Sequence, residues 1–297
     1  MLRRAALSLV LLGVAIAGCG GSQGSSDAPT VVATTTQLAD IARNIAPGAH
    51  VKAILSANTD PHEYEVRPDD VKALASADIV LRSGGEVDAW LGGALEAAGV
   101  DEQDVVDAGA AAGLEGDDPH WWQDPVRVEK AAASIGRAFA AAGLPDESAA
   151  YVARLKRLDA SVRACMDKVP ASQRLLVTSH DALGYYARRY GIRVVGAVIP
   201  ALTTAAQPSA GDVAKLVSTI ERTGVRTIFA ESSVNPKVEE AIARQTGARV
   251  GPPLWADSLG PKGSSGATYL GSIAFNTEAL AGGFTSGAVT CRQGIPW

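Results

Sequence analysis

The feature that most constrains the fold of this chain is an alternation of short β-branched segments with alanine-rich segments of helical periodicity. We expect strands at residues 31–35, 50–55, 78–83, 175–179, 193–199, 227–231 and 249–254. Helices are predicted at residues 37–46, 68–77, 126–143, 209–224 and 236–247. Strands that alternate with helices in this way are typical of α/β proteins with mainly parallel sheets.

One long helical segment separates the two sets of strands. Its apolar residues have helical spacing, Asp146 is a candidate N-cap and Pro170 marks the end. At about 1.5 Å per residue, such a helix is about 35 Å long, which is the length of a domain. We therefore predict an N-terminal α/β lobe at 30–144, a linking helix at 145–169 and a C-terminal α/β lobe at 170–297. The alternative is a single larger sheet with this helix in its core.

The N-terminal residues predict export and lipid anchoring. Two arginines precede a short apolar run, and the sequence IAGC that ends at Cys19 resembles the lipobox of bacterial lipoproteins. The apolar run is too short to remain as a membrane-spanning helix, since a bilayer core is about 30 Å thick. We expect a signal peptide at 1–18, a lipidated Cys19, a flexible Gly/Ser-rich tether at 19–29 and an extracytoplasmic, membrane-anchored protein. A plain secretory signal with an incidental cysteine is the alternative.

Charge and cysteine content exclude several classes of function. The net charge is −5 and the chain contains no basic run, so nucleic acid is not expected as a partner. The three cysteines form no CxxC motif, which argues against a thiolate metal site. Cys165 and Cys291 either form a disulfide in an oxidising compartment or remain free thiols.

The placement of histidine predicts a ligand site. The chain has four histidines, and two of them, His62 and His120, follow an identical Asp-Pro step. Proline restrains the backbone on both sides, so each turn presents its imidazole from a stiff position. His180 directly follows a predicted strand, where ligands gather in open α/β sheets. Glu231 and Asp257 occupy similar positions, whereas His50 has no such context and is expected at the surface.

Three imidazoles and one carboxylate form a ligand set suited to tetrahedral Zn²⁺, while Mn²⁺ favours more oxygen ligands. Asp60 and Asp118 are candidates for orienting the histidine rings, or they only stabilise their turns. Glu231 either contacts the metal or hydrogen-bonds to one of its ligands.

Six segments carry a resemblance to a known family. They are VVATTTQLADIARNIAPG, NTDPHEYEVRPDDVKALASADIVLRSG, DPHWWQDP, LLVTSHDALGYYARRYG, TIFAESSVNPKVEEAIARQTG and LWADSLGPKGSSGATYL, which together span about residues 30 to 280. In this order they resemble the solute-binding lipoproteins of bacterial zinc and manganese ABC importers. The resemblance implies two α/β lobes joined by one rigid long helix, with the metal in the cleft between the lobes.

The resemblance also implies a site and a function. His62 and His120 would come from the first lobe, and His180 and Asp257 from the second. We expect a monomer that captures a divalent metal and delivers it to an ABC permease. The family's manganese-type members usually have glutamate at the position of His180, so Zn²⁺ is favoured over Mn²⁺ or Fe²⁺. The histidine-rich loop of many zinc-specific members is absent before His120, and YEV replaces the common Tyr-Glu-Pro.

Other function classes fit the residues less well. A secreted zinc hydrolase needs an open coordination position, and the chain has neither HExxH nor Gly-x-Ser-x-Gly. We therefore expect no enzymatic activity. A siderophore or cobalamin binder would share the architecture but needs a wide aromatic or basic cleft. A surface adhesin remains an alternative or an added role.

Overall fold

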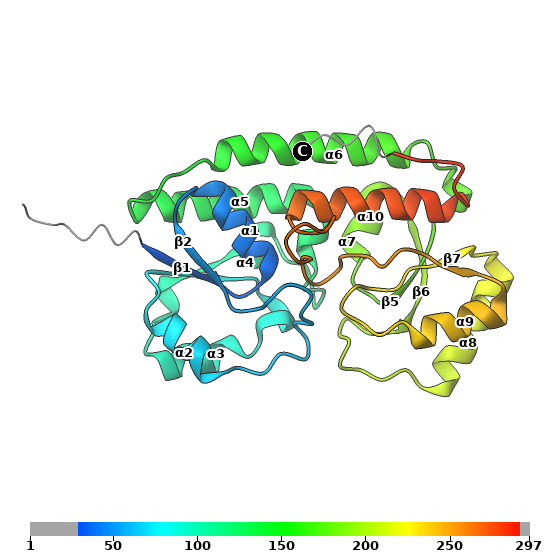
Figure 1. The fold of residues 1–297 in the computed structure, drawn as a ribbon, viewed down its shortest axis with the longest axis horizontal. Coiled ribbons are helices and arrows are strands. Elements are labelled where there is room, and N and C mark those ends of the chain that lie inside the picture. The colour runs from blue at the N-terminus through cyan, green and yellow to red at the C-terminus, as the bar shows by residue number, and fades with distance from the viewer. Residues whose placement is uncertain (1–28, 292–297) are drawn as a thin grey trace, which may run out of the picture.

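The computed structural model describes residues 29–291. The predicted signal peptide and Cys19 lie outside the described residues. Helices and strands alternate along the chain and form two α/β lobes placed side by side, as Figure 1 shows.

The first lobe is built on a four-stranded parallel sheet with the order β2-β1-β3-β4. Its strands are β1 (Thr30–Ala33), β2 (His50–Ala53), β3 (Ile79–Arg82) and β4 (Val105–Asp107). Its helices are α1 (Thr36–Ile45), α2 (Pro68–Ala75), α3 (Leu91–Ala98), α4 (Ala108–Ala112) and α5 (Pro125–Ala141). Local sequence signals begin these helices: the Thr35 hydroxyl accepts the Leu38 N–H at the start of α1, and Pro125 opens α5 behind the Asp124 cap.

The second lobe repeats this strand order. Its strands are β5 (Leu175–His180), β6 (Arg193–Ile199), β7 (Thr227–Ile228) and β8 (Arg249–Val250). The pairs β5–β6 and β7–β8 are parallel, and a parallel bridge between Thr178 and Phe229 places β7 beside β5. Its helices are α7 (Gly184–Tyr190), α8 (Ala210–Thr223), α9 (Lys237–Thr246) and α10 (Tyr269–Phe284). The order β6-β5-β7-β8 therefore matches β2-β1-β3-β4.

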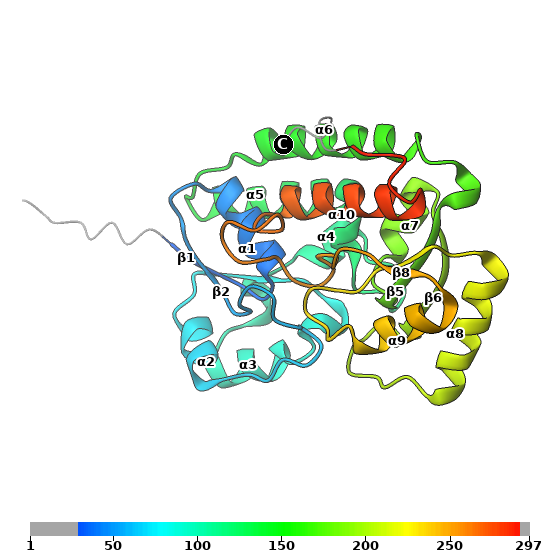
Figure 2. The ribbon, with the colours of Figure 1, turned by 45° about the vertical axis from the view of Figure 1, so that its right-hand side comes forward.

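One long helix, α6 (Ser148–Met166), connects the lobes. In Figures 1 and 2 it runs along one side of the molecule, and α5 and α10 lie beneath it, over the first and second lobes respectively. Its buried stripe includes Tyr151, Leu155, Leu158 and Val162. A continuous apolar core that includes this stripe extends into both lobes. The α/β architecture expected from the sequence, two similar lobes and one connecting helix, is confirmed.

Several boundaries differ from the sequence-based expectation. The linking helix is shorter than 145–169, because Asp146 accepts the Ser148 N–H and so lies outside the helix. Strands β7 and β8 are reduced to two residues each, although the backbone remains extended enough for a bridge between Glu231 and Leu254. Strand β4 and helices α3, α4, α7 and α10 had not been predicted. Helix α10 is buried on most of its circumference, so it lacks the polar face that makes a helix visible in sequence.

The segment that follows α10 is linked covalently to helix α6. Cys165 of α6 and Cys291 form a disulfide with a Cα–Cα distance of 5.8 Å, and both residues are buried. Of the two alternatives for these cysteines, the structure therefore contains the paired one. Among the described residues, no helix combines the length and the apolar character needed to cross a membrane.

Candidate metal centre

The two Asp-Pro-His turns place their histidines through the same local contact. The carboxylate of Asp60 accepts the backbone N–H of His62 at 3.0 Å, and that of Asp118 accepts the backbone N–H of His120 at 3.1 Å. Asp118 also contacts the His120 ring, with Oδ1 2.9 Å from Nδ1. Asp118 therefore orients an imidazole, whereas the contact of Asp60 is with the backbone of its turn. The second oxygen of Asp60 instead accepts the hydroxyl of Thr204, from the other lobe, at 2.7 Å.

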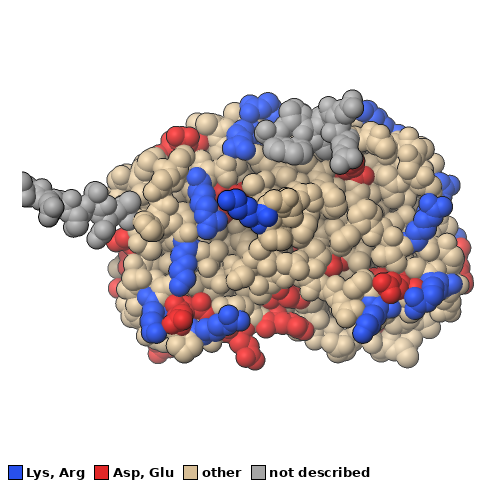
Figure 3. Space-filling view, in the orientation of Figure 1, with Lys and Arg blue, Asp and Glu red and all other residues tan. Residues whose placement is uncertain are grey.

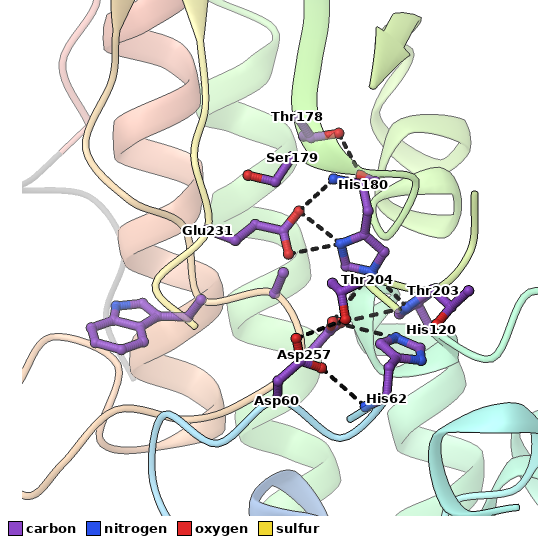
Figure 4. A network of polar contacts seen from close by, with 12 residues as sticks. Asp60, His62, His120, Thr178, Ser179, His180, Thr203, Thr204, Glu231 and Asp257 are labelled. Carbon is purple, nitrogen blue, oxygen red and sulfur yellow. Dashed lines mark hydrogen bonds and ion pairs between the residues drawn. The ribbon is translucent and has the colours of Figure 1, made fainter. Parts of the chain in front are cut away.

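His180 is the last residue of β5 and is held by Glu231. The Glu231 carboxylate accepts the His180 backbone N–H at 2.9 Å, and its two oxygens lie 2.9 and 2.8 Å from His180 Nδ1. Both side chains are essentially fully buried. Glu231 thus fixes the ring so that Nε2 points away from it, toward the space between the lobes (Figure 4).

Asp257 lies on a loop that is fastened from two sides. The amide of Asn276 in α10 pairs with both the N–H and the carbonyl of Trp255. From the first lobe, Trp122 Nε1 and Gln123 Nε2 donate to the carbonyl of Ala256 at 2.9 and 2.7 Å. The Asp257 loop follows β8 in sequence, yet it is tied to the first lobe next to His120.

The four predicted ligands converge on one point. Their candidate donor atoms all lie within 4.8 Å of one another. Figure 4 shows the four side chains pointing toward one another. The Nε2 atoms of His62, His120 and His180 lie 3.5, 3.4 and 3.2 Å from the nearest Asp257 oxygen, and the Nε2 atoms of His120 and His180 are 3.3 Å apart. A tetrahedron with metal–ligand bonds of about 2.0–2.1 Å has edges of about 3.3 Å. The spacing therefore suits a tetrahedral ion at the centre.

Electrostatics make the pocket a strong site for positive charge. Burial alone would lower the pKa of His180, but the carboxylates of Asp257 and Glu231 outweigh it and raise the pKa to about 10. Burial would likewise raise the pKa of Asp257, but the positive charge of the neighbouring imidazoles, His180 first, holds it below its usual value. The negative charge of Asp257 and Glu231 is therefore balanced by a positive charge in the pocket, which is either a proton on His180 or a metal ion.

Several buried donor and acceptor atoms in this pocket have no hydrogen-bond partner. They include Nε2 of His62 and both carboxylate oxygens of Asp257. Buried polar atoms without partners are rare in folded proteins because each costs free energy. All three point into the cluster, so a bound ion would satisfy them together.

The structure brings together all four residues that the sequence singled out as ligands. Glu231 lies behind His180 and not in the cluster of donor atoms. His50 is exposed on β2, away from the site. The sequence analysis missed Gln123 and Asn276, which hold the Asp257 loop. Nothing in their local sequence indicates this role, since each acts on a segment distant along the chain.

A model of the family described as "Zinc-uptake complex component A periplasmic" matches residues 31–283. The chain belongs to this family. It is therefore a substrate-binding protein of the metal ABC importer class, as the six sequence segments predicted.

Individual relatives bind different metals according to their names. The zinc-binding protein TroA of Treponema pallidum is 32% identical, over 94% of this chain and 98% of its own. The manganese-binding lipoprotein MntA of Bacillus subtilis is also 32% identical, with the same coverage. A solved structure of periplasmic TroA superposes with a TM-score of 0.78 at 29% identity, over 86% of this chain and 99% of TroA. The expected two-lobe fold agrees with this structural likeness.

Proposed function

We propose that this protein captures one Zn²⁺ ion between its lobes, with His62, His120, His180 and Asp257 as ligands, and delivers it to an ABC permease. The observation that carries the proposal is the convergence of three imidazole Nε2 atoms and the Asp257 carboxylate, with four separations of 3.2–3.5 Å between buried donor atoms that have few other partners. Membership of the family supports a role in a metal ABC importer, and the side chains at the site support zinc as the bound metal.

The donor set supports zinc as the cargo. Three imidazole nitrogens and one carboxylate suit Zn²⁺, and divalent zinc binds nitrogen sites more tightly than divalent manganese or iron. Mn²⁺ is the second candidate, because MntA is as similar to this chain as TroA is. Manganese would have to accept a nitrogen-rich site in which Asp257 is the single carboxylate among the four donors.

The test of cargo is metal content after purification without chelators, followed by competition titration. We expect one zinc per chain, and tighter binding of Zn²⁺ than of Mn²⁺ or Fe²⁺ by the metal-depleted protein. Zinc lost readily on washing while manganese is retained would overturn the assignment. Stoichiometry near zero for all three ions would overturn the site itself.

The same proposal includes an extracytoplasmic place at the membrane, anchored by a lipid on Cys19. Its support is the IAGC sequence and the names of relatives such as MntA, a lipoprotein. Cys19→Ser should move the protein from the membrane fraction to the soluble fraction, because a lipid anchor is its only proposed attachment. A Cys19→Ser protein that stays with membranes after a salt wash would contradict the anchor. We also expect the protein to be a monomer. We expect no enzymatic activity, because four protein ligands would leave a bound zinc ion no open position for a water molecule.

A further inference from the structure

The second lobe contacts both of the Asp-Pro-His turns that carry ligands of the first lobe. We call them the His62 turn (60–62) and the His120 turn (118–120). The ligand side chains are at most 1% exposed, and on the face drawn in Figure 3 the surface continues from one lobe to the other over the middle of the molecule. The lobes therefore enclose the centre. In each turn, the aspartate is the residue that the second lobe contacts.

At the His62 turn, the contact comes from Thr204, a buried residue of the segment that follows β6. The Thr204 hydroxyl donates to Asp60 Oδ2 at 2.7 Å. The other oxygen of the same carboxylate, Oδ1, accepts the backbone N–H of His62 at 3.0 Å. Figure 4 shows these three residues in one group. One carboxylate thus connects a hydroxyl of the second lobe with the backbone of a ligand in the first.

At the His120 turn, the contact comes from helix α7. The Tyr185 hydroxyl accepts the N–H of Glu115 at 2.8 Å and donates to the carbonyl of Asp118 at 3.2 Å. Its neighbour Gly184 leaves room for the Asp118 side chain, since a β-carbon there would lie only 2.9 Å from Asp118 Oδ2. The other oxygen, Oδ1, lies 2.9 Å from His120 Nδ1. Helix α7 therefore holds both the backbone and the carboxylate of the residue that orients His120.

We infer that Thr204 and Gly184 are positioning residues of the metal centre, which fix the two turns across the lobe boundary and align His62 and His120 while the lobes are together. The inference rests on the proposed function. Residues that stand behind the ligands of a metal set how well its donor atoms are pre-organised, and therefore how tightly the metal is held. Separation of the lobes would then withdraw His180 and also release the alignment of the two histidines that stay behind.

The first part of the test concerns the Thr204 hydroxyl in the full-length protein. Thr204→Val keeps the shape of the side chain and should weaken zinc binding in a competition titration by about fivefold or more, the effect of losing one hydrogen bond. Thr204→Ser restores the hydroxyl and should bind normally. Thr223→Val is the matched control, because its hydroxyl bonds only to carbonyls within α8. In an Asp60→Ala background, Thr204→Val should have no further effect, since the contact is already lost.

The second part of the test concerns the space at Gly184. Gly184→Ala places a methyl group against the Asp118 carboxylate, which must move away from His120 because it is the flexible neighbour. Zinc affinity should fall by about tenfold, the lower end of the usual effect of disturbing such a partner. The matched control is Gly92→Ala, in an exposed part of α3 where the added carbon would meet nothing within 4 Å. Neither Gly184 nor Gly92 has a positive φ, so the backbone accepts alanine at both positions.

Zinc binding by the unsubstituted protein tests the proposed function, and the comparison of each variant with its control tests the inference. Equal zinc affinity within both pairs would overturn the inference and leave the function standing. An undiminished effect of Thr204→Val in the Asp60→Ala background would also contradict it. Thermal unfolding of the metal-free variants separates positioning from a structural role. We expect unchanged melting temperatures, and a loss of stability that accounts for the loss of affinity would overturn the inference.

Discussion

At the residue scale, the centre depends on carboxylates that stand behind the imidazoles. Glu231 contacts His180 Nδ1, and Asp118 contacts His120 Nδ1, so Nε2 of each ring is left to face Asp257. Such contacts fix the tautomer of a ligand histidine and raise its basicity. The repeated Asp-Pro-His triplet is therefore not used identically, since only one of its two aspartates contacts the ring of its histidine in this structure.

The substitution Glu231→Gln tests whether the Glu231 carboxylate, which contacts His180 Nδ1, strengthens zinc binding by His180. Glutamine preserves the shape and can still accept a hydrogen bond, but it removes the negative charge next to Nδ1. We expect zinc affinity in a competition titration to fall about 10–100-fold, the usual effect of losing such a partner. Glu240→Gln, on the exposed face of α9, is the control and should bind zinc normally. Unchanged affinity in Glu231→Gln would mean that this carboxylate has no part in binding.

The pKa of His180 predicts how zinc competes with protons. Its pKa is raised to about 10, so the imidazole is charged in the metal-free protein at neutral pH. This charge stabilises the folded state below pH about 6.5, and the stabilisation is lost as the pH rises toward 10. Asp257 has a lowered pKa, so its contribution is present above its ordinary value of 3.8 and is lost in acid.

Zinc binding should therefore release a proton from His180 at pH 7 to 8, and affinity should keep rising with pH above 6.5, where an ordinary imidazole would already be neutral. Isothermal titration calorimetry in buffers of different ionisation enthalpy measures this release directly. Zinc binding without proton release at pH 7.5 would show that His180 is neutral before the metal arrives.

At the element scale, the sequence predicts what depends on local patterns. The strands that precede the site and the linking helix were found from β-branched runs and helical spacing. Helix α10 was missed because its buried faces leave no amphipathic signal. The three histidine ligands were predicted from turn chemistry and a strand end, whereas the choice of Asp257 over Glu231 came from the resemblance to the family. Their supports, Gln123 and Asn276, depend on contacts with a loop 133 and 21 residues away, respectively, which no local pattern encodes.

The disulfide links the segment after α10, at the end of the second lobe, to helix α6. It closes a segment of 126 residues, so its removal should lower the free energy of unfolding by about 2–4 kcal/mol. Denaturant unfolding of the metal-depleted protein with and without a reductant measures this difference. A Cys165→Ser, Cys291→Ser double variant is the control and should not respond to the reductant. If the unsubstituted protein also fails to respond, the disulfide contributes nothing to stability.

At the scale of the whole molecule, two lobes with the same strand order meet at one cluster of ligands. His62 and His120 belong to the first lobe and His180 to the second, while the Asp257 loop follows β8 but is fastened to both lobes. A metal ion at this place would bind the lobes to each other across a boundary that α6 already spans. Loss of a ligand on either side should then abolish the same stabilisation.

The most direct test of this account is the zinc affinity of three proteins: the unsubstituted chain, His180→Ala and His50→Ala. We predict one tight site in the unsubstituted protein and a loss of more than about 100-fold in His180→Ala, which exceeds the usual effect of losing a supporting partner. His50→Ala removes an exposed imidazole from the same protein and should change nothing. Equal zinc affinity in His180→Ala and the unsubstituted protein would contradict a site shared between the lobes.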